Sequence, residues 1–163
     1  MIYSRSAEYA IRAFVYLAQV PDGKFAMVKN ISNEEDIPGH FLAKILQQLA
    51  RKGLLRSSKG PTGGFALRVD PAEIRLLDIV EALDGLAPYQ QCAAGLSECS
   101  DVMACPIHDS WVNLRSRIME YLGRNTIADL ARALEQKKKS IAQTKQRKGR
   151  RAGHSKRAEA KKA

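Results

Sequence analysis

The most constraining feature of the chain is the order of patterns in residues 28–69, where two helical patterns lead directly into a glycine-rich hairpin pattern. Helices are expected from about Val28 to Asp36 and from about Gly39 to Lys52, because apolar residues recur there at helical spacing. The apolar stripe of the second helix consists of Leu42, Ile45, Leu46 and Leu49. Pro38 separates the two helices, since proline disfavours helical backbone at the residue before it. This arrangement predicts a helix-turn-helix unit.

The hairpin follows the second helix without a gap. Strands are expected at Leu54–Ser58 and Phe65–Val69, and the residues between them, GPTGG at 60–64, are dense in turn formers. A helix-turn-helix followed by a β-hairpin is the order of a winged helix. A nucleotide-binding phosphate loop is excluded, because the segment lacks G-K-S/T and no helical pattern starts directly after it.

Other segments favour helices, so the predicted fold is mainly α with a small β-hairpin. These segments are residues 6–20, 71–85 and 106–124, and a last short helix that starts with a capping pattern at Thr126 and ends at Leu134. The expected core residues of the first two are Ala7, Ile11, Phe14, Leu17, Ala18, Ile74, Leu77, Ile79, Val80 and Leu83. The long helix carries an apolar stripe of Trp111, Leu114, Ile118, Tyr121 and Leu122. Such a stripe favours a dimerisation helix over packing onto its own domain.

The formal net charge of +10 is concentrated at the C-terminal end. Residues 136–163 contain 12 Lys/Arg against one acid, a net charge of +11, whereas residues 1–135 contain 15 Lys/Arg against 16 Asp/Glu, a net charge of −1. The terminal segment has one residue of the Val/Ile/Leu/Phe/Met class, Ile141, and cannot form a core, so a disordered basic tail is expected. It is either a solubility tail or a non-specific nucleic-acid arm.

Polar and basic residues off the apolar stripes indicate a double-stranded DNA-binding surface. On the second helix of the unit these residues are His40, Lys44, Gln47, Gln48 and Arg51, and on the hairpin they are Arg56, Lys59, Thr62, Gly63 and Arg68. Such side chains reach base edges and phosphates, and a glycine-rich tip allows the backbone to approach the sugar–phosphate wall. The alternative is a polar face that contacts only solvent.

All three cysteines of the chain lie in residues 92–108, with the spacing C-x6-C-x5-C-x2-H. An odd number of cysteines argues against a disulfide framework, and no apolar run is long enough to span a membrane, so a cytoplasmic protein with reduced thiols is expected. Thiolates are ligands of iron–sulfur clusters and of zinc. The segment is therefore an iron–sulfur site, a zinc site, a metal-free thiol switch or a coincidence of composition.

Residues 1–135 resemble the winged-helix iron–sulfur cluster regulators of the IscR and NsrR type. The resemblance rests on SAEYAIRA, IPGHFLAKILQQLARKGLLRSSKGPTGGFAL, LLDIVEALDG, CPIHDSW and TIADLARAL. It implies a homodimer with crossed long helices, here about residues 107–123, and a 2Fe–2S or 4Fe–4S cluster held by Cys92, Cys99 and Cys105. The fourth ligand would be His108 or Glu8 of the partner subunit. The first gap has six residues where the best-known loops of the family have five.

The expected organisation is a winged helix-turn-helix DNA-binding domain at 1–86, a cluster-binding loop at 87–106, a dimerisation helix with a short C-terminal helix at 107–135, and a basic tail at 136–163. The expected function is a transcriptional regulator, acting as a repressor, whose cluster senses redox state, nitric oxide or cluster supply. The alternatives are a cluster-free thiol sensor and a zinc-bearing RNA-binding protein. No nucleophile–base pair, phosphate loop or paired carboxylates support an enzyme.

Overall fold

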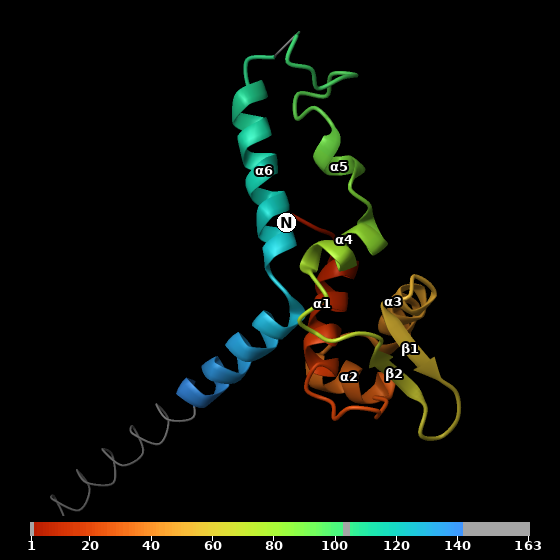
Figure 1. The fold of residues 1–163 in the computed structure, drawn as a ribbon. Helices are drawn as coiled ribbons and strands as arrows, with labels where there is room; N and C mark the ends of the chain where they lie inside the picture. Colours follow the sequence, from red (N-terminus) through yellow and green to blue (C-terminus); the bar gives the residue numbers. More distant parts are fainter. Residues whose placement is uncertain (1, 103–104, 142–163) are drawn as a thin grey trace, which may run out of the picture.

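The computed structural model describes residues 2–102 and 105–141. Its elements are α1 (Arg5–Leu17), α2 (Val28–Glu35), α3 (Gly39–Arg51), β1 (Leu55–Ser58), β2 (Gly64–Leu67), α4 (Leu76–Asp84), α5 (Ala87–Gln90) and α6 (His108–Arg124). Residues 127–141 are also helical. Figure 1 shows α1 to α4 and the hairpin gathered in one domain, from which α6 projects. The predicted fold, mainly α with a small hairpin, is confirmed.

Helix α1 is central to the domain because its small and apolar residues let neighbouring helices pack closely. Ala7, Ala10 and Phe14 are completely buried, and α1 contacts α2, α3 and α4. Its first turn is capped by Ser4, whose side chain accepts a hydrogen bond from Ala7 N at 3.1 Å. The predicted core face of this helix is therefore confirmed, except that Ala18 is only half-buried.

The turn between α2 and α3 is closed by a short-range hydrogen-bond network. Asp36 ends α2 in the left-handed conformation, with φ of 50°, which Asp tolerates better than most residues. Ser32 binds Ile37 twice, since Ser32 O accepts from Ile37 N and Ser32 Oγ donates to Ile37 O at 2.6 Å. Ile37 is 3% exposed and anchors the turn in the core. The four predicted stripe residues of α3 are all buried, so its polar face points outward.

The two strands pair antiparallel, with Leu55 opposite Leu67 and Ser58 opposite Gly64. A third segment supports them, because Ala26 and Phe65 exchange two backbone hydrogen bonds of 2.9 Å. This close approach explains the glycine at position 64. A Cβ there would lie 2.1 Å from Ala26 O, and φ is 148°. The hairpin is thus fastened to the domain at its second strand.

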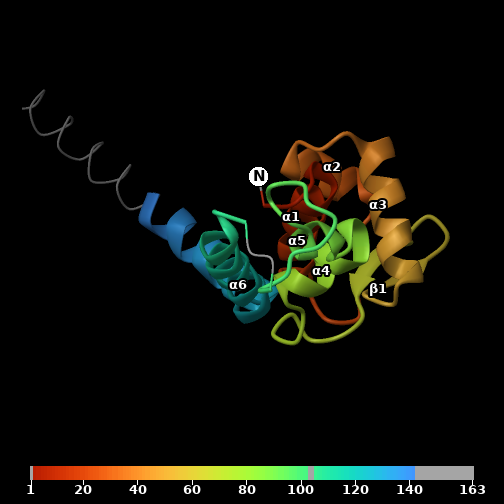
Figure 2. The ribbon, with the colours of Figure 1, turned by 90° about the horizontal axis from the view of Figure 1, so that it is seen from above.

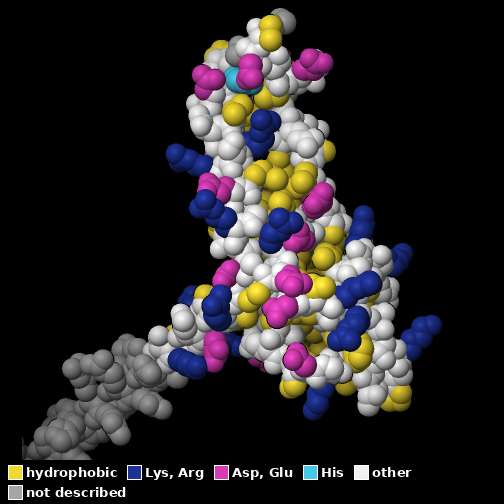
Figure 3. Space-filling model, in the orientation of Figure 1, with side chains coloured by type: hydrophobic (Ala, Val, Ile, Leu, Met, Phe, Trp, Pro, Cys, Tyr) yellow, Lys and Arg dark blue, Asp and Glu magenta, His cyan; other side chains and the backbone are white. Residues whose placement is uncertain are grey.

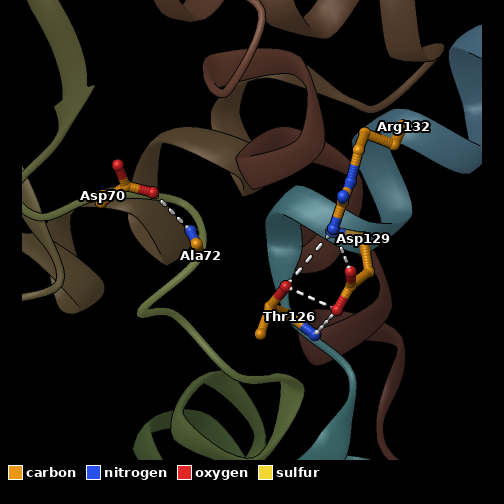
Figure 4. Close-up of polar contacts among 5 residues, drawn as sticks. All are labelled: Asp70, Ala72, Thr126, Asp129 and Arg132. Carbon is orange, nitrogen blue, oxygen red and sulfur yellow. Dashed lines mark hydrogen bonds and ion pairs between the residues drawn. The ribbon is translucent and has the colours of Figure 1, made fainter.

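The helical segment 127–141 is tied to the domain by backbone contacts at residues 125–128. Ile127 N donates to Ile74 O at 2.9 Å, and both side chains are buried. Thr126 and Asp129 cap each other, as predicted: Thr126 Oγ1 accepts from Asp129 N, and Asp129 Oδ2 accepts from Thr126 N. Figure 4 shows this box together with Arg132, which pairs with Asp129 from the next turn.

Some predicted boundaries were wrong. The helix expected at 71–85 begins only at Leu76, because the backbone at 74–76 pairs with residues 125–127 instead. Residues 87–90 form the short helix α5 inside the predicted loop. The last helix does not end at Leu134 but continues to residue 141, so residues 136–141 are not the disordered tail that the composition suggested. The rest of that tail, 142–163, lies outside the described residues. Within the described ranges no helix combines the length and apolar character needed to cross a bilayer.

Candidate functional site

The surface formed by α3 and the hairpin is strongly and uniformly basic. Residues 37–69 contain six Lys/Arg and no Asp/Glu, although the first 135 residues together have a net charge of −1. The six cations are Lys44, Arg51, Lys52, Arg56, Lys59 and Arg68, and all are exposed. Figure 3 shows Lys and Arg side chains projecting on the side of the molecule that carries α3 and the hairpin. A surface of this kind attracts polyanions and repels cations.

The structure brings the predicted residues of α3 together at a shallow hollow. Its lining consists of Lys44, Gln47, Gln48, Arg51 and Lys52. A second hollow joins α3 to the hairpin and is lined by Gln47, Ala50, Arg51, Leu55, Ser57 and Phe65. His40, Thr62 and Lys59 are exposed as well. Lys52 was not among the predicted contact residues, although its place in the last turn of the helix is visible in the sequence.

Two of the predicted contact residues, Gln48 and Arg56, also make contacts within the domain. Gln48 Nε2 donates to Ala82 O of α4 at 3.4 Å. Arg56 donates to Leu67 O at 3.3 Å, and its guanidinium lies 5.8 Å from the ring centre of Phe25. Strand alternation places Arg56 on the hairpin face opposite to that of Leu55 and Ser57.

Gly63 is buried, and its lack of a side chain has a local cause. A Cβ at this position would lie 2.4 Å from Ser58 O. The wing tip therefore needs Gly63 to fold, whatever it binds.

The cysteine loop, residues 91–107, joins α5 to α6 at the end of α6 that is remote from the basic surface (Figures 1 and 2). Trp111 of α6 fixes the start of the loop, because its Nε1–H donates to Gln91 O at 2.9 Å. Tyr89 of α5 is buried, and its hydroxyl donates to Ile2 O. Trp111, predicted only as part of the dimerisation stripe, thus also contacts its own loop.

His108 starts α6 and lies among the loop residues. It is the only buried polar or charged side chain in the described part of the chain, with 6% of its surface exposed. Its Nδ1 lies 3.6 Å from Cys99 Sγ, and its Nε2 lies 2.7 Å from Asp101 Oδ1. Its backbone N–H donates to Cys105 O at 2.9 Å. Asp101 was not among the predicted site residues, because its partnership with His108 depends on how the loop folds back.

Cys99 and Cys105 both lie near enough to Cys92 to affect its thiol. Backbone N–H groups of Leu96 and Ala94 hold the pKa of the Cys92 thiol below its ordinary value, and the neighbouring Cys105 and Cys99 side chains lower it further. All three cysteines are free and half-buried. Among residues 2–102 and 105–141, no three His, Cys, Asp or Glu side chains are spaced to hold a single metal ion. The loop therefore places Cys99 and Cys105 near Cys92, and it places His108 beside Cys99.

Glu8 lies on the first turn of α1 and not in this loop. Its carboxylate is 4.0 Å from the guanidinium of Arg12, which in turn binds Glu35 at the end of α2. Figure 1 shows α1 well below the cysteine loop of the same chain. Within one chain the structure therefore unites His108 with the cysteines and leaves Glu8 apart.

Comparison with known proteins gives a consistent picture. Residues 3–133 match the family model Rrf2, described as iron-dependent transcriptional regulator. A protein of Aquifex aeolicus named as an HTH-type transcriptional regulator is 36% identical over 132 residues, which cover 80% of this chain and 91% of the relative. A Mycobacterium tuberculosis protein of the same description is 33% identical over 132 residues, covering 80% of this chain and 81% of that protein.

Two solved structures superpose on most of this chain. CymR, the global cysteine regulator of Bacillus subtilis, superposes with a TM-score of 0.68 at 25% identity, over 80% of this chain and 95% of CymR. The IscR of T. potens superposes with a TM-score of 0.65 at 25% identity, over 82% of this chain and 88% of that structure.

Proposed function

Because the chain belongs to the Rrf2 family of transcriptional regulators, we propose that it is a DNA-binding repressor whose activity depends on an iron–sulfur cluster in the cysteine loop. The observation that carries the proposal is the position of His108, a buried histidine whose Nδ1 lies 3.6 Å from Cys99 Sγ in the loop that holds all three cysteines. Members of this family regulate transcription and are not enzymes. The cluster, the ligands and the dimer are the proposed part.

The basic surface supports binding of double-stranded DNA. Helix α3 exposes Lys44, Gln47 and Arg51 beside a hairpin that exposes Lys59, so one helix and one wing can contact the duplex together. Amide and guanidinium groups can bind base edges in the major groove, and ammonium groups neutralise phosphates. The absence of acids from residues 37–69 removes a source of repulsion.

The donor set of the loop suits an iron–sulfur cluster. Cys92, Cys99 and Cys105 would supply three thiolates and His108 an imidazole, and these residue types ligate such clusters. The lowered pKa of Cys92 favours the thiolate, which is the ligating form. When bound, the cluster would supply a redox- and ligand-sensitive centre. The protein residues hold and orient it, and the length of the first gap leaves room for its bulk.

The exposed stripe of α6 supports a homodimer. Ile107, Leu114 and Tyr121 are seven residues apart and 47%, 52% and 48% exposed, respectively. Figure 3 shows hydrophobic side chains along the projecting part of the molecule that α6 and the loop form. A projecting helix with a heptad-spaced apolar stripe fits a second copy of itself. Two winged domains would then present two α3 helices to a two-fold operator.

A cluster-free thiol switch is the second candidate, and one observation favours it. The Cys92 thiol, whose pKa is lowered, lies near two other thiols, an arrangement in which oxidation can form a disulfide. The similarity to CymR, a cysteine regulator, is compatible with this alternative. The two candidates differ in iron content.

Anaerobic purification followed by an absorption spectrum and by iron and sulfide assays tests the cluster. We expect visible absorbance with iron and acid-labile sulfide in similar amounts, and loss of both in each of the variants Cys92→Ala, Cys99→Ala and Cys105→Ala. Colourless protein that reversibly forms a disulfide would favour the thiol switch. Zinc without sulfide would instead favour a structural zinc site.

Variants of the basic surface test the DNA contact. A duplex selected from a random pool serves as the ligand. Arg51→Ala and Lys59→Ala should each weaken binding, and loss of a phosphate contact should reduce the slope of log K against log salt by about one unit. Arg117→Ala, which removes an exposed cation from α6, is the matched control. Unchanged affinity and slope in both surface variants would contradict the proposed interface.

A further inference from the structure

The two ring nitrogens of His108 have different partners, and this difference has chemical consequences. Nε2 is 2.7 Å from a carboxylate oxygen of Asp101, whereas Nδ1 is 3.6 Å from Cys99 Sγ. A buried imidazole needs partners for both nitrogens, and the structure leaves no buried side-chain nitrogen or oxygen unpaired in the described residues. The hydrogen bond from His108 N to Cys105 O fixes the backbone at the same point.

The carboxylate of Asp101 determines where the imidazole proton lies. An ionised carboxylate only accepts hydrogen bonds, so the 2.7 Å contact places N–H on Nε2. In a neutral imidazole the lone pair is then on Nδ1, which is the nitrogen that faces Cys99 Sγ. Metal-binding histidines commonly donate their second ring N–H to a carboxylate, which fixes the tautomer and the orientation of the ring.

We infer that Asp101 is a positioning residue, which orients His108 and holds it in the Nε2–H tautomer so that Nδ1 is offered to the cluster. The ligand role of His108 rests on the proposed function, but the tautomer is a property of the cluster-free protein. The side chain of Asp101 is 96% exposed. Exposed ion pairs add little to folding stability, so orientation of the ring is the main effect expected of this carboxylate.

The tautomer is measured first, on the reduced, cluster-free protein. Histidine labelled with 15N in its ring gives long-range proton–nitrogen correlations that distinguish the two tautomers in mildly alkaline buffer, where imidazoles are neutral. Wild-type protein should show His108 as the Nε2–H tautomer, and Asp101→Ala should show a mixture. Asp101→Glu should restore the wild-type pattern at least in part.

Glu98→Ala is the matched control for the tautomer experiment. It removes another exposed carboxylate from the same loop, and no described hydrogen bond or ion pair involves Glu98. The control should resemble wild type in all spectra. An Nδ1–H tautomer in wild type, or unchanged His108 signals in Asp101→Ala, would overturn the inference.

The second measurement uses protein reconstituted with iron and sulfide under anaerobic conditions. Loss of a carboxylate that supports a ligating histidine should raise the rate of iron transfer to a chelator by about 10- to 100-fold and should change the visible spectrum. Equal rates and spectra for Asp101→Ala and Glu98→Ala would overturn the positioning role. Wild-type protein that takes up no iron would overturn the proposed function, while the tautomer data would still decide the orientation of His108.

Discussion

Alanine at Gly64 should destabilise the protein more than alanine at Gly60, although both glycines lie in the hairpin loop region with positive φ. Their φ values are 148° and 106°. An L-residue in such a conformation costs about 1–3 kcal/mol, and the stiffer unfolded chain returns about 0.4–1 kcal/mol of this. A Cβ at Gly60 meets no atom within 4 Å, so this position reports backbone strain alone.

Gly64 has a second cost because its surroundings are backbone. The new Cβ would lie 2.1 Å from Ala26 O, and no rotation of a side chain can relieve that collision. The second strand would have to move away from Ala26 and lose the two hydrogen bonds between Ala26 and Phe65. At about 0.5–1.5 kcal/mol each, these bonds add about 1–3 kcal/mol. We therefore expect Gly64→Ala to lower the free energy of unfolding by about 1.5–5.5 kcal/mol, and Gly60→Ala by about 0.5–2.5 kcal/mol.

Urea denaturation followed by far-ultraviolet circular dichroism measures both losses on the same reduced, cluster-free protein. Gly63→Ala adds a third case, because its Cβ would lie 2.4 Å from Ser58 O without a positive φ. Equal losses at Gly60 and Gly64 would refute the argument, since the collision with Ala26 would then have no energetic effect. A Gly64→Ala variant that keeps its stability but loses DNA affinity would show that this glycine serves the ligand and not the fold.

Three further changes test other parts of the structure. Leu114→Asp should weaken dimerisation at least about tenfold, measured by sedimentation equilibrium, because a half-exposed leucine in a two-fold interface contributes twice. Ser116→Asp on the same helix is the control. Equal effects of the two substitutions would exclude the apolar stripe as the interface. Trp111→Phe removes the 2.9 Å bond to the carbonyl at position 91, so amide hydrogen exchange in the cysteine loop should accelerate while the free energy of unfolding falls by no more than about 1.5 kcal/mol. The pKa of Asp129 is lowered, first by the hydroxyl of its capping partner, so its contribution to stability is present at neutral pH and is lost as pH falls through this lowered pKa. The difference in unfolding free energy between wild type and Asp129→Asn should therefore shrink in acid, and a difference that grows in acid would contradict the capping role.

The sequence predicted the elements with local causes most accurately. The four stripe residues of α3 are buried, and the helix has the predicted start and nearly the predicted end. The capping pattern at Thr126 also forms as predicted, because a capping box depends on residues three positions apart. The assignment to a family of winged-helix regulators, made from sequence motifs, is confirmed by the match over residues 3–133.

Errors arose where distant segments determine the local structure. The start of α4 could not be predicted, since the backbone of Arg75 pairs with that of Thr126, which lies fifty-one positions further along the chain. The partnership of Asp101 with His108 requires the loop to fold back onto α6. Gln48 has the residue type of a base reader, yet its amide donates to α4, which only the packing of the two helices reveals. The ligand role of the cysteines stays a prediction.

A series of hydrogen bonds through α4 links the residues next to the cysteine loop with α3 at the proposed DNA surface. Trp111 of α6 donates a hydrogen bond to the carbonyl of Gln91 at the start of the loop. Tyr89 of α5, just before the loop, donates one to the carbonyl of Ile2 in the N-terminal segment. That segment reaches α4 through Ser4, whose N–H and hydroxyl both donate to the carboxylate of Asp84. The same turn of α4 accepts the amide of Gln48 from α3. A movement of α5 that keeps these hydrogen bonds would shift α4 and α3 together, and would therefore move Gln48 at the proposed DNA surface. A movement that breaks the Tyr89 bond would leave α4 and α3 in place.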